Sequence, residues 1–341
     1  MELTNSDIAE LLAIEAETAK HHVQRAFRRA SRAALLWPEE AADVLNREES
    51  LASLPAIGPF LEKFLRRWLE DPPHVPERPP LRKQFLSYTE AQRILAARPG
   101  WSRKLRGDLQ MHTEWSDGSA TVRQMAEAAI ERGYQYVAIT DHAKKLKIAG
   151  GINEEQLTEQ ATEIAEFNDA TRQFKILRSI ELNLDLQGAG DLDAKSLNEL
   201  DIVLGAFHSS LRKSEDQTER YLAALKNPSV HILGHPRGRI YNFRLGLMAD
   251  WPRVFSLAAE LGKAVEIDCY PDRQDLNLDL VKIAAQAGTH LSLGTDAHHC
   301  WQLQFIDFGL ASALAANFPK ERVLNFMSVD QLKNWVTSIK R

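Results

Sequence analysis

Apolar residues follow two kinds of pattern along the chain. Short apolar runs recur through its last two thirds, and each is followed by a longer stretch in which apolar residues return at helical spacing. The runs lie at residues 136–139, 174–177, 202–204, 231–233 and 290–293, and a shorter strand-like run begins at Gly107. Such alternation predicts parallel strands joined by crossover helices.

The first 72 residues show the helical pattern alone. A first helix begins near a cap at Thr4, Asn5 or Ser6. A second is expected over residues 19–36, and a third around 41–50. The second helix carries four arginines on one flank, at Arg25, Arg28, Arg29 and Arg32. A solvated helix face is the alternative interpretation of that flank.

The stretch LASLPAIGPFL at residues 51–61 has the layout of a helix-hairpin-helix, with an apolar helix end, a tight turn and a second helix. Unpaired backbone N–H groups at the start of such a helix suit a phosphate oxygen. Residues 73–104 are expected to be a linker, because prolines stiffen its first part. It also holds a short helix from Thr89, the expected cap, to Ala97.

Polar residues that can bind metal stand just after the apolar runs. Parallel strands that each end in such a residue predict a β/α barrel, whose strand ends converge on one mouth. The residues are His112, His142, Glu181, His208, His235, Asp296 and His298. Asp141, beside His142, is expected to orient an imidazole rather than to bind metal. Imidazole and carboxylate together favour Zn²⁺, Mn²⁺ or Fe²⁺. Any one of these residues alone could be structural, and His231 and His290, inside the runs, are assigned to that class.

Composition narrows the class of protein. The 341 residues fit a barrel of about 250 residues with a small second domain. The absence of a run of about 18 apolar residues argues against a membrane span. Two cysteines cannot form a disulfide framework, so a cytoplasmic location is expected. The net charge of −5 argues against coating of nucleic acid by bulk charge, although residues 1–104 carry about +1 and the remainder about −6.

Two resemblances add to these expectations. QRAFRRASRAALL and LPAIGPFLEKFL resemble the helical DNA-binding domain that opens family X DNA polymerases, although Ala56 stands where that hairpin usually has glycine. Nothing resembles the polymerase fingers and palm. From residue 105 onward the chain resembles the PHP family, named for polymerase and histidinol phosphatase. The matching motifs are DLQMHTEWSDG, ITDHAKKLKIAGG, SIELNL, GAFHSS, GHPRGR, EIDCYPDRQDL and LGTDAHH.

The PHP resemblance implies a distorted seven-stranded barrel at 105–341 with two to three divalent metal ions. The first site would use Gln110, His112, Glu181 and Asp296; the second, Glu181 as a bridge with His208 and His235; the third, Asp117, His142 and His298. Gln110 departs from the family, which normally has histidine there, and its neutral amide oxygen suits zinc poorly. Arg239 and Arg273 are expected to grip substrate phosphate, with surface salt bridges as the alternative.

Three functions are compatible with these features. The first is a metal-dependent phosphoesterase acting on DNA, as a 3′–5′ exonuclease or 3′-end-processing enzyme in repair. The second is a small-molecule phosphatase of the histidinol-phosphate type, with the helical domain as a lid or dimer contact. The third is a DNA-binding or scaffolding protein whose catalysis is weakened by Gln110. The acidic barrel and Ala56 count against DNA, and the arginine flank counts for it.

Overall fold

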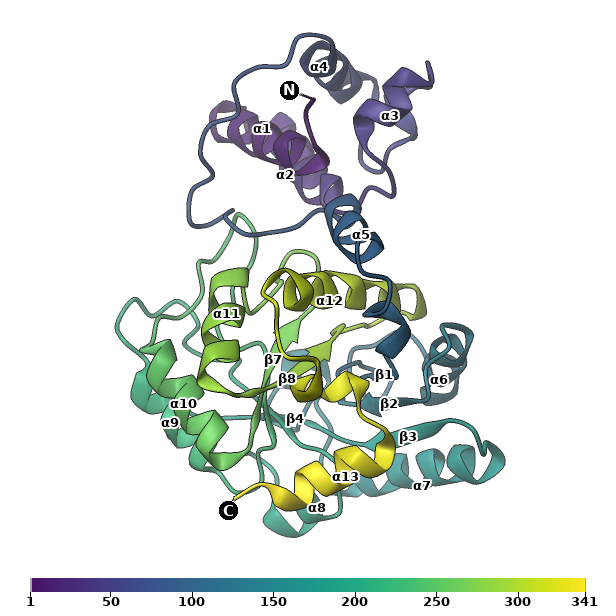
Figure 1. Cartoon of the computed structure of the whole chain (residues 1–341), viewed down its shortest axis with the longest axis vertical. Coiled ribbons are helices and arrows are strands. Elements are labelled where there is room, and N and C mark those ends of the chain that lie inside the picture. The colour runs from purple at the N-terminus through teal and green to yellow at the C-terminus, as the bar shows by residue number, and fades with distance from the viewer. Residues whose placement is uncertain (1, 341) are drawn as a thin grey trace. The chain divides into compact units, whose positions relative to one another are not determined.

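A computed structural model describes residues 2–340 of the chain (Figure 1). The chain divides into two compact units. The first contains residues Met1–Ala97 together with two short later segments, Ile240–Leu245 and Pro271–Arg273. The second contains the rest of the chain from Arg98 onward. We refer to them as the helical unit and the barrel unit.

The helical unit is built from five α-helices and one short 3-10 helix within the described residues. They are α1 (Asn5–Thr18), α2 (His21–Ala34), α3 (Ala41–Asn46), η1 (Leu51–Ser53), α4 (Pro59–Glu70) and α5 (Tyr88–Ala96). Thr4 caps α1 and exchanges hydrogen bonds with Asp7, which satisfies two of the unpaired N–H groups at the helix start. Ser87 caps α5 in the same way with Glu90, so the expectation that Thr89 is the cap was wrong.

The core of the helical unit is shared by α1, α2, α3 and α4. Phe27 of α2 is buried and packs edge-on against Phe60 and Phe64 of α4, with ring centroids 6.0 and 5.3 Å apart. The opposite face of α2 carries Arg25, Arg28, Arg29 and Arg32, all of which are exposed. None of these four guanidinium groups makes an ion pair with any of residues 2–340.

The expected hairpin region contains a strained turn. Ala56 has a φ of 65°, in the left-handed region that favours glycine. Gly58 is the N-cap of α4 without a side-chain hydrogen bond, and Pro59 is the first residue of the helix. Space around Gly58 is open, since a Cβ placed there would meet no atom within 4 Å.

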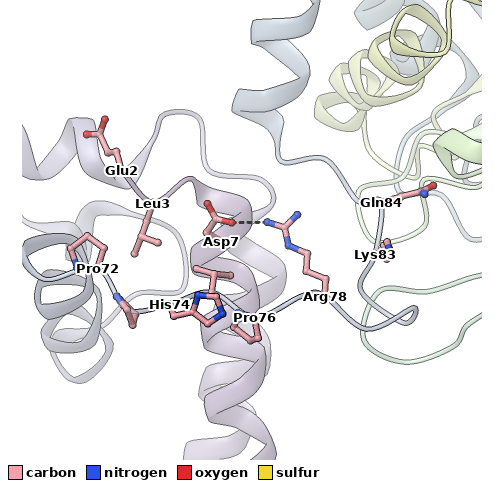
Figure 2. A pocket seen from close by; sticks show the side chains of 11 residues that line it. Glu2, Leu3, Asp7, Pro72, His74, Pro76, Arg78, Lys83 and Gln84 are labelled. Atoms are coloured by element: carbon pink, nitrogen blue, oxygen red, sulfur yellow. Dashed lines mark hydrogen bonds and ion pairs between the residues drawn. The ribbon is translucent and has the colours of Figure 1, made fainter.

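The proline-rich connector runs beside the start of α1, and the two line an open cavity of about 620 Å³ (Figure 2). Its charged lining groups pair within the unit: Arg78 bonds Asp7 at 2.9 Å, and Lys83 bonds Glu77 at 2.9 Å. The candidate metal ligands do not line this cavity.

The two later segments complete the helical unit. Tyr241 is 2% exposed and belongs to its apolar core. Arg82 is also buried, and it makes two bonds to Glu10 and one to Glu17, all at 2.8–2.9 Å. The same guanidinium donates to Asn242 Oδ1 at 3.0 Å. Residues separated by more than 140 positions therefore share one core.

The barrel unit contains eight parallel strands within the described residues. They are β1 (Gly107–Asp108), β2 (Tyr136–Ile139), β3 (Lys175–Arg178), β4 (Glu181–Asn183), β5 (Leu204–Ala206), β6 (Ile232–Leu233), β7 (Ala264–Asp268) and β8 (His290–Gly294). They form sheets ordered β1-β2-β3 and β4-β5-β6-β7-β8. The expected runs at 136–139 and 290–293 coincide with β2 and β8 within one residue, whereas β7 was not expected.

Hydrogen bonds connect the two sheets at both seams. At one, Asp296 N donates to Gln110 O and His112 N to Ala297 O, which joins the chain after β8 to the chain after β1. At the other, His142 forms a bridge with Glu181, and only Ser179 and Ile180 separate β3 from β4. Because both seams are closed in this way, the ends of the strands meet in one place. The α/β class expected from the sequence is confirmed.

Helices follow the strands and surround the sheets of the barrel unit (Figure 1). They are α6 (Val122–Glu131), α7 (Glu154–Ala170), α8 (Ala194–Asn198), α9 (Thr218–Lys226), α10 (Trp251–Leu261), α11 (Leu278–Ala287), α12 (Ile306–Ala315) and α13 (Val329–Ser338), with short 3-10 turns η2 (Ser102–Lys104), η3 (Lys147–Ala149), η4 (Cys300–Phe305), η5 (Lys320–Arg322) and η6 (Leu324–Phe326). Across residues 2–340, no helix has both the length and the apolar character that a membrane crossing requires.

Candidate metal centre

A single buried carboxylate, Glu181, stands at the centre of the site. It is the first residue of β4 and has no exposed surface. Its Oε1 lies 2.8 Å from His208 Nε2 and 2.7 Å from His235 Nε2. Its Oε2 lies 3.3 Å from His112 Nε2 and 3.5 Å from His142 Nδ1. Four imidazoles from the ends of four strands therefore face one carboxylate.

A second carboxylate, Asp296, stands after β8. Its Oδ1 lies 2.9 Å from His112 Nε2, and it is 2% exposed. His112, Glu181 and Asp296 offer ligand atoms that all lie within 4.8 Å of one another. These are three of the four residues that the sequence assigned to the first metal site.

A third carboxylate, Asp117, lies on the more open side of the cluster. Its Oδ1 is 3.2 Å from His298 Nε2 and 3.6 Å from His142 Nε2. The rings of His142 and His298 both stack on that of His112, with centroids 4.3 and 4.5 Å away. His112 consequently joins the group of the third site as well, and His142 joins a group with Glu181 and His208. The two histidines lie between sites that the sequence treated as separate.

Gln110 lies beside the same carboxylate. Its Nε2 donates to Glu181 Oε2 at 3.2 Å, while its Oε1 is buried and makes no hydrogen bond. Gly294 makes room for this side chain, because a Cβ at Gly294 would lie 2.5 Å from Gln110 Cβ. Turning the amide over would present the oxygen to the cluster, since amide nitrogen and oxygen occupy equivalent positions.

The backbone is strained at two of these positions. His235 has a φ of 23° and Asp296 a φ of 53°, although neither is glycine. Such conformations cost about 1–3 kcal/mol each and persist where the surrounding structure imposes them. The backbone N of His235 donates a hydrogen bond to Glu266 Oε2 at 2.7 Å, which holds the backbone at this position.

Several groups around the cluster were not expected from the sequence. Asn183 Oδ1 accepts from His208 Nδ1 at 3.0 Å and so fixes the orientation of that ring. Gln302 Oε1 accepts from the backbone N of His298 at 2.7 Å. Both residues stand close in sequence to a ligand motif, Asn183 two positions after Glu181 and Gln302 four after His298. That proximity is the only signal that could have identified them.

Asp141 has a different role from the one expected. Its carboxylate accepts from Thr113 N, Thr113 Oγ1 and Ser116 Oγ at 2.6–2.8 Å, and also from Gln160. It makes no bond to an imidazole, so the expectation that it orients one was wrong. It holds the turn that carries Asp117 instead.

Burial and neighbouring charges shift the pKa values of the groups in the cluster. Burial alone would raise the pKa of Glu181, but the imidazoles of His142, His235 and His208 hold it well below its usual range. Burial opposes protonation of His112, yet its bonds to Asp296 and Glu181 raise its pKa well above the ordinary value. Burial lowers the pKa of His142 to about 4, so that imidazole is neutral near pH 7.

The two arginines expected to grip phosphate lie in different surroundings. Arg239 is 3% exposed, and burial lowers its pKa to about 9. Arg273 is half-buried and belongs to a segment of the helical unit. Lys144 pairs with Glu154 at 2.6 Å, whereas Lys145 and Lys147 are exposed.

His231 and His290, which the sequence assigned to structure rather than to metal, have structural contacts, and so have His299 and Cys300 beside His298. His231 Nδ1 accepts from Val203 N at 3.1 Å, and His290 packs against the ring of Trp335. His299 bonds Ser119 Oγ and joins none of the ligand groups. Cys300 is partly buried against the core beside α6.

The residues present fit divalent metal ions. Gln110 Oε1, His112 Nδ1 and His142 Nδ1 are buried without a hydrogen bond, and such atoms cost about 1–3 kcal/mol each unless a partner satisfies them. Imidazole and carboxylate sets of this kind bind zinc, manganese or iron. Divalent ions held by a shared carboxylate supply a coordinated water of lowered pKa and offset the charge of a phosphate.

An α/β ring of parallel strands, with imidazoles and carboxylates gathered at one end, defines a class of metal-dependent hydrolase. The family model for the PHP domain matches residues 108–288, more than half of the chain. The chain therefore belongs to the PHP family, and it is a metal-dependent phosphoesterase.

Relatives differ in how much of their length the chain covers. It is 37% identical over 231 residues to the DNA polymerase/3′-5′ exonuclease PolX of Bacillus subtilis, a match that covers 67% of this chain and 40% of that protein. The chain thus spans two fifths of that relative. It is 31% identical over 251 residues to a probable phosphatase of Caldanaerobacter subterraneus subsp. tengcongensis, covering 68% of this chain and 92% of that protein.

A solved phosphatase structure aligns with part of the chain. Histidinol phosphate phosphatase from Lactococcus lactis, solved with zinc, L-histidinol and phosphate, aligns with a TM-score of 0.45 and 16% identity. The alignment covers 63% of this chain and 94% of that chain.

Proposed function

We propose that the protein hydrolyses phosphodiester bonds at the 3′ ends of DNA, as a metal-dependent 3′–5′ exonuclease or end-processing enzyme in repair. The observation that carries the proposal is the arginine face of α2. Four exposed guanidinium groups stand on a helix of 14 residues that has no Asp or Glu, in a chain of net charge −5. Unpaired arginines at helical spacing suit successive phosphates of a nucleic acid.

The hairpin region supports the same assignment. Gly58 leaves the start of α4 open. The dipole of α4 and the unpaired N–H groups of its first turn favour a phosphate there. Ala56 has the left-handed conformation that a glycine would adopt more easily, so the turn has the required shape at a cost in strain. The resemblance to the helical domain of family X polymerases implies the same ligand.

The shape of the metal centre favours attack at a chain end. Glu181 and His112 have no exposed surface, whereas the side chains of Asp117 and His298 are 35% and 22% exposed. The cluster is therefore open on the side of Asp117 and closed at Glu181. A terminal nucleotide can enter such a site from its one open side. An internal phosphate would need room for the nucleic-acid strand on both sides of it.

Each residue has a role in this reaction. Glu181, Asp296 and the histidines around them would hold the ions, and the Glu181 carboxylate belongs to two of the ligand groups. Water adds to the terminal phosphorus, the bond to the 3′ oxygen of the preceding nucleotide breaks, and that oxygen takes a proton. The products are a 5′-mononucleotide and a strand with a free 3′ hydroxyl.

The test is hydrolysis by the purified full-length chain with Mn²⁺. Single- and double-stranded DNA labelled at either end should be compared with a panel of phosphomonoesters, including histidinol phosphate. We expect 3′ label to be released first as mononucleotide, and Glu181→Gln to abolish release. Rapid cleavage of phosphomonoesters with intact DNA would refute the proposal.

A small-molecule phosphatase is the second candidate. Its support is the probable phosphatase of Caldanaerobacter, of which this chain covers 92% against 40% of the polymerase-exonuclease. Activity on phosphomonoesters that is insensitive to salt and unchanged when Arg25, Arg28 and Arg29 are neutralised would favour it. A metal-loaded protein that binds DNA and hydrolyses neither substrate would be a scaffold.

A further inference from the structure

The loop that carries His235 continues into the core of the helical unit. Tyr241 stands six positions after His235 in the sequence, in the segment Ile240–Leu245. Its hydroxyl lies 3.1 Å from Ser31 Oγ and 3.4 Å from the carbonyl oxygen of Ala9. Its ring meets Phe85 edge-on, with centroids 5.1 Å apart. The side chain is thus fixed on three sides by the helical unit.

Neighbouring contacts hold the same segment. Asn242 accepts from the buried Arg82 at 3.0 Å, and its own backbone N donates to Leu81 O at 3.2 Å. Tyr241 N donates to Asp272 O at 2.7 Å, which ties the segment to the one that carries Arg273. The two loops that follow β6 and β7 are therefore joined to each other and to the helices.

The helix that receives Tyr241 also carries the arginines. Ser31 is fully buried on α2, while Arg28, Arg29 and Arg32 are exposed on its other side. One helix consequently presents cations to solvent and binds, through Ser31, the loop that begins at a candidate metal ligand.

We propose that Tyr241 is a positioning residue that links the arginine face of α2 to the loop after His235. The inference rests on the proposed function. A strand bound along α2 is then tethered, through the anchored segment Ile240–Leu245, to the chain that carries His235, and tethering raises its effective concentration at the site. Loosening the Tyr241 contact lowers that concentration for a long strand, and a short substrate that does not reach α2 is unaffected.

Tyr241→Phe tests the link with a small change, because it removes only the hydroxyl. The measured quantity is kcat/KM for a 20-nucleotide single strand divided by kcat/KM for a dinucleotide. One lost hydrogen bond of about 0.5–1.5 kcal/mol predicts a fall in this ratio of about 2- to 10-fold. The fall should appear in KM of the long strand, with unchanged metal content and unchanged kcat for the dinucleotide.

Two further variants make the result specific. Asn242→Gly removes the contact with Arg82 and keeps the positive φ of 51° accessible, so it should lower the ratio as Tyr241→Phe does. Tyr136→Phe is the matched control, because it also removes a buried hydroxyl bonded to a carbonyl oxygen (3.2 Å, Leu324), but in the barrel unit. It should leave the ratio unchanged.

Hydrogen exchange of residues 236–245 gives a readout that does not depend on activity. Exchange should be faster in Tyr241→Phe and Asn242→Gly than in the parent protein. Unchanged exchange, or equal losses on both substrates, would overturn the proposed link. A parent protein without any preference for the long strand would instead refute the DNA-binding role of α2, while faster exchange in the variants would still support the anchoring by Tyr241.

Discussion

Replacement of Glu181 by glutamine is the sharpest test of the metal centre. The substitution keeps the size and shape of the side chain and removes only its charge. In the structure the carboxylate is fully buried and lies within 3.5 Å of His112, His142, His208 and His235. Glu181 is also the only carboxylate that belongs to two of the three ligand groups.

The expected size of the effect follows from this shared position. Residues that merely orient a metal ligand change metal affinity by about 10–100-fold. If the Glu181 carboxylate is shared by two ions, its loss should cost at least that factor at each, so the combined affinity should fall by about 10²- to 10⁴-fold, or about 2.7–5.5 kcal/mol. Activity at fixed metal concentration should fall at least as far, because the charge beside the attacked phosphate changes as well.

The assay is metal content after dialysis, followed by activity against added Mn²⁺ for parent and variant. Glu114→Gln is the matched control, because Glu114 is an exposed carboxylate on the turn that follows His112. Circular dichroism and thermal unfolding should confirm that both variants are folded. A Glu181→Gln protein that keeps its metal and hydrolyses within about threefold of the parent rate would refute the assignment of Glu181 as the bridge.

Three further predictions concern Gln110, His112 and the arginine face of α2. Gln110→His should raise zinc affinity and narrow any preference for Mn²⁺ over Zn²⁺, since zinc prefers nitrogen to an amide oxygen; identical metal titrations of parent and variant would mean that Gln110 does not contact metal. Metal affinity should rise with pH by up to about tenfold per unit while His112 is protonated, because the raised pKa of that imidazole means that a proton must leave as the metal binds. Calorimetry in buffers of different ionisation enthalpy measures the released proton, and a metal affinity that is flat between pH 6 and 8 would contradict the assignment of His112 as a ligand. Each of Arg25, Arg28 and Arg29 changed to glutamine should lower the slope of log affinity for DNA against log salt by roughly 0.7–0.9, and three variants with the parent slope would remove the phosphate contacts from α2.

The sequence predicted those elements whose apolar pattern is uninterrupted. The runs at β2 (YVAI) and β8 (HLSLG) stand out because neither contains an Asp, Glu, Lys or Arg. β7 does not, because Glu266 and Asp268 stand inside it and are fully buried. Their burial depends on neighbours from other strands, such as the backbone N of His235 that bonds Glu266, and no local pattern reports such a contact.

The candidate ligands could be predicted because parallel strands bring their ends together. Which histidine belongs to which metal site could not be predicted, because it depends on how the individual imidazole rings are positioned. His112 and His142 stack at 4.3 Å and so enter more than one group. Asp141 was assigned to an imidazole from its position beside His142, but alternation along the chain directs its side chain to Thr113 and Ser116.

The discontinuous composition of the helical unit has a consequence for the order of folding during synthesis. Its first 97 residues leave the ribosome well before Tyr241, Asn242 and the segment Pro271–Arg273 exist. Until then Arg82 lacks its bond to Asn242, and the space beside Phe85 that Tyr241 fills has no occupant. Contacts across some 210 positions form slowly, since a long loop must close first. The core between the nascent helices therefore remains incomplete until the chain has been made past β7. A fragment that ends at Ala97 lacks part of this core.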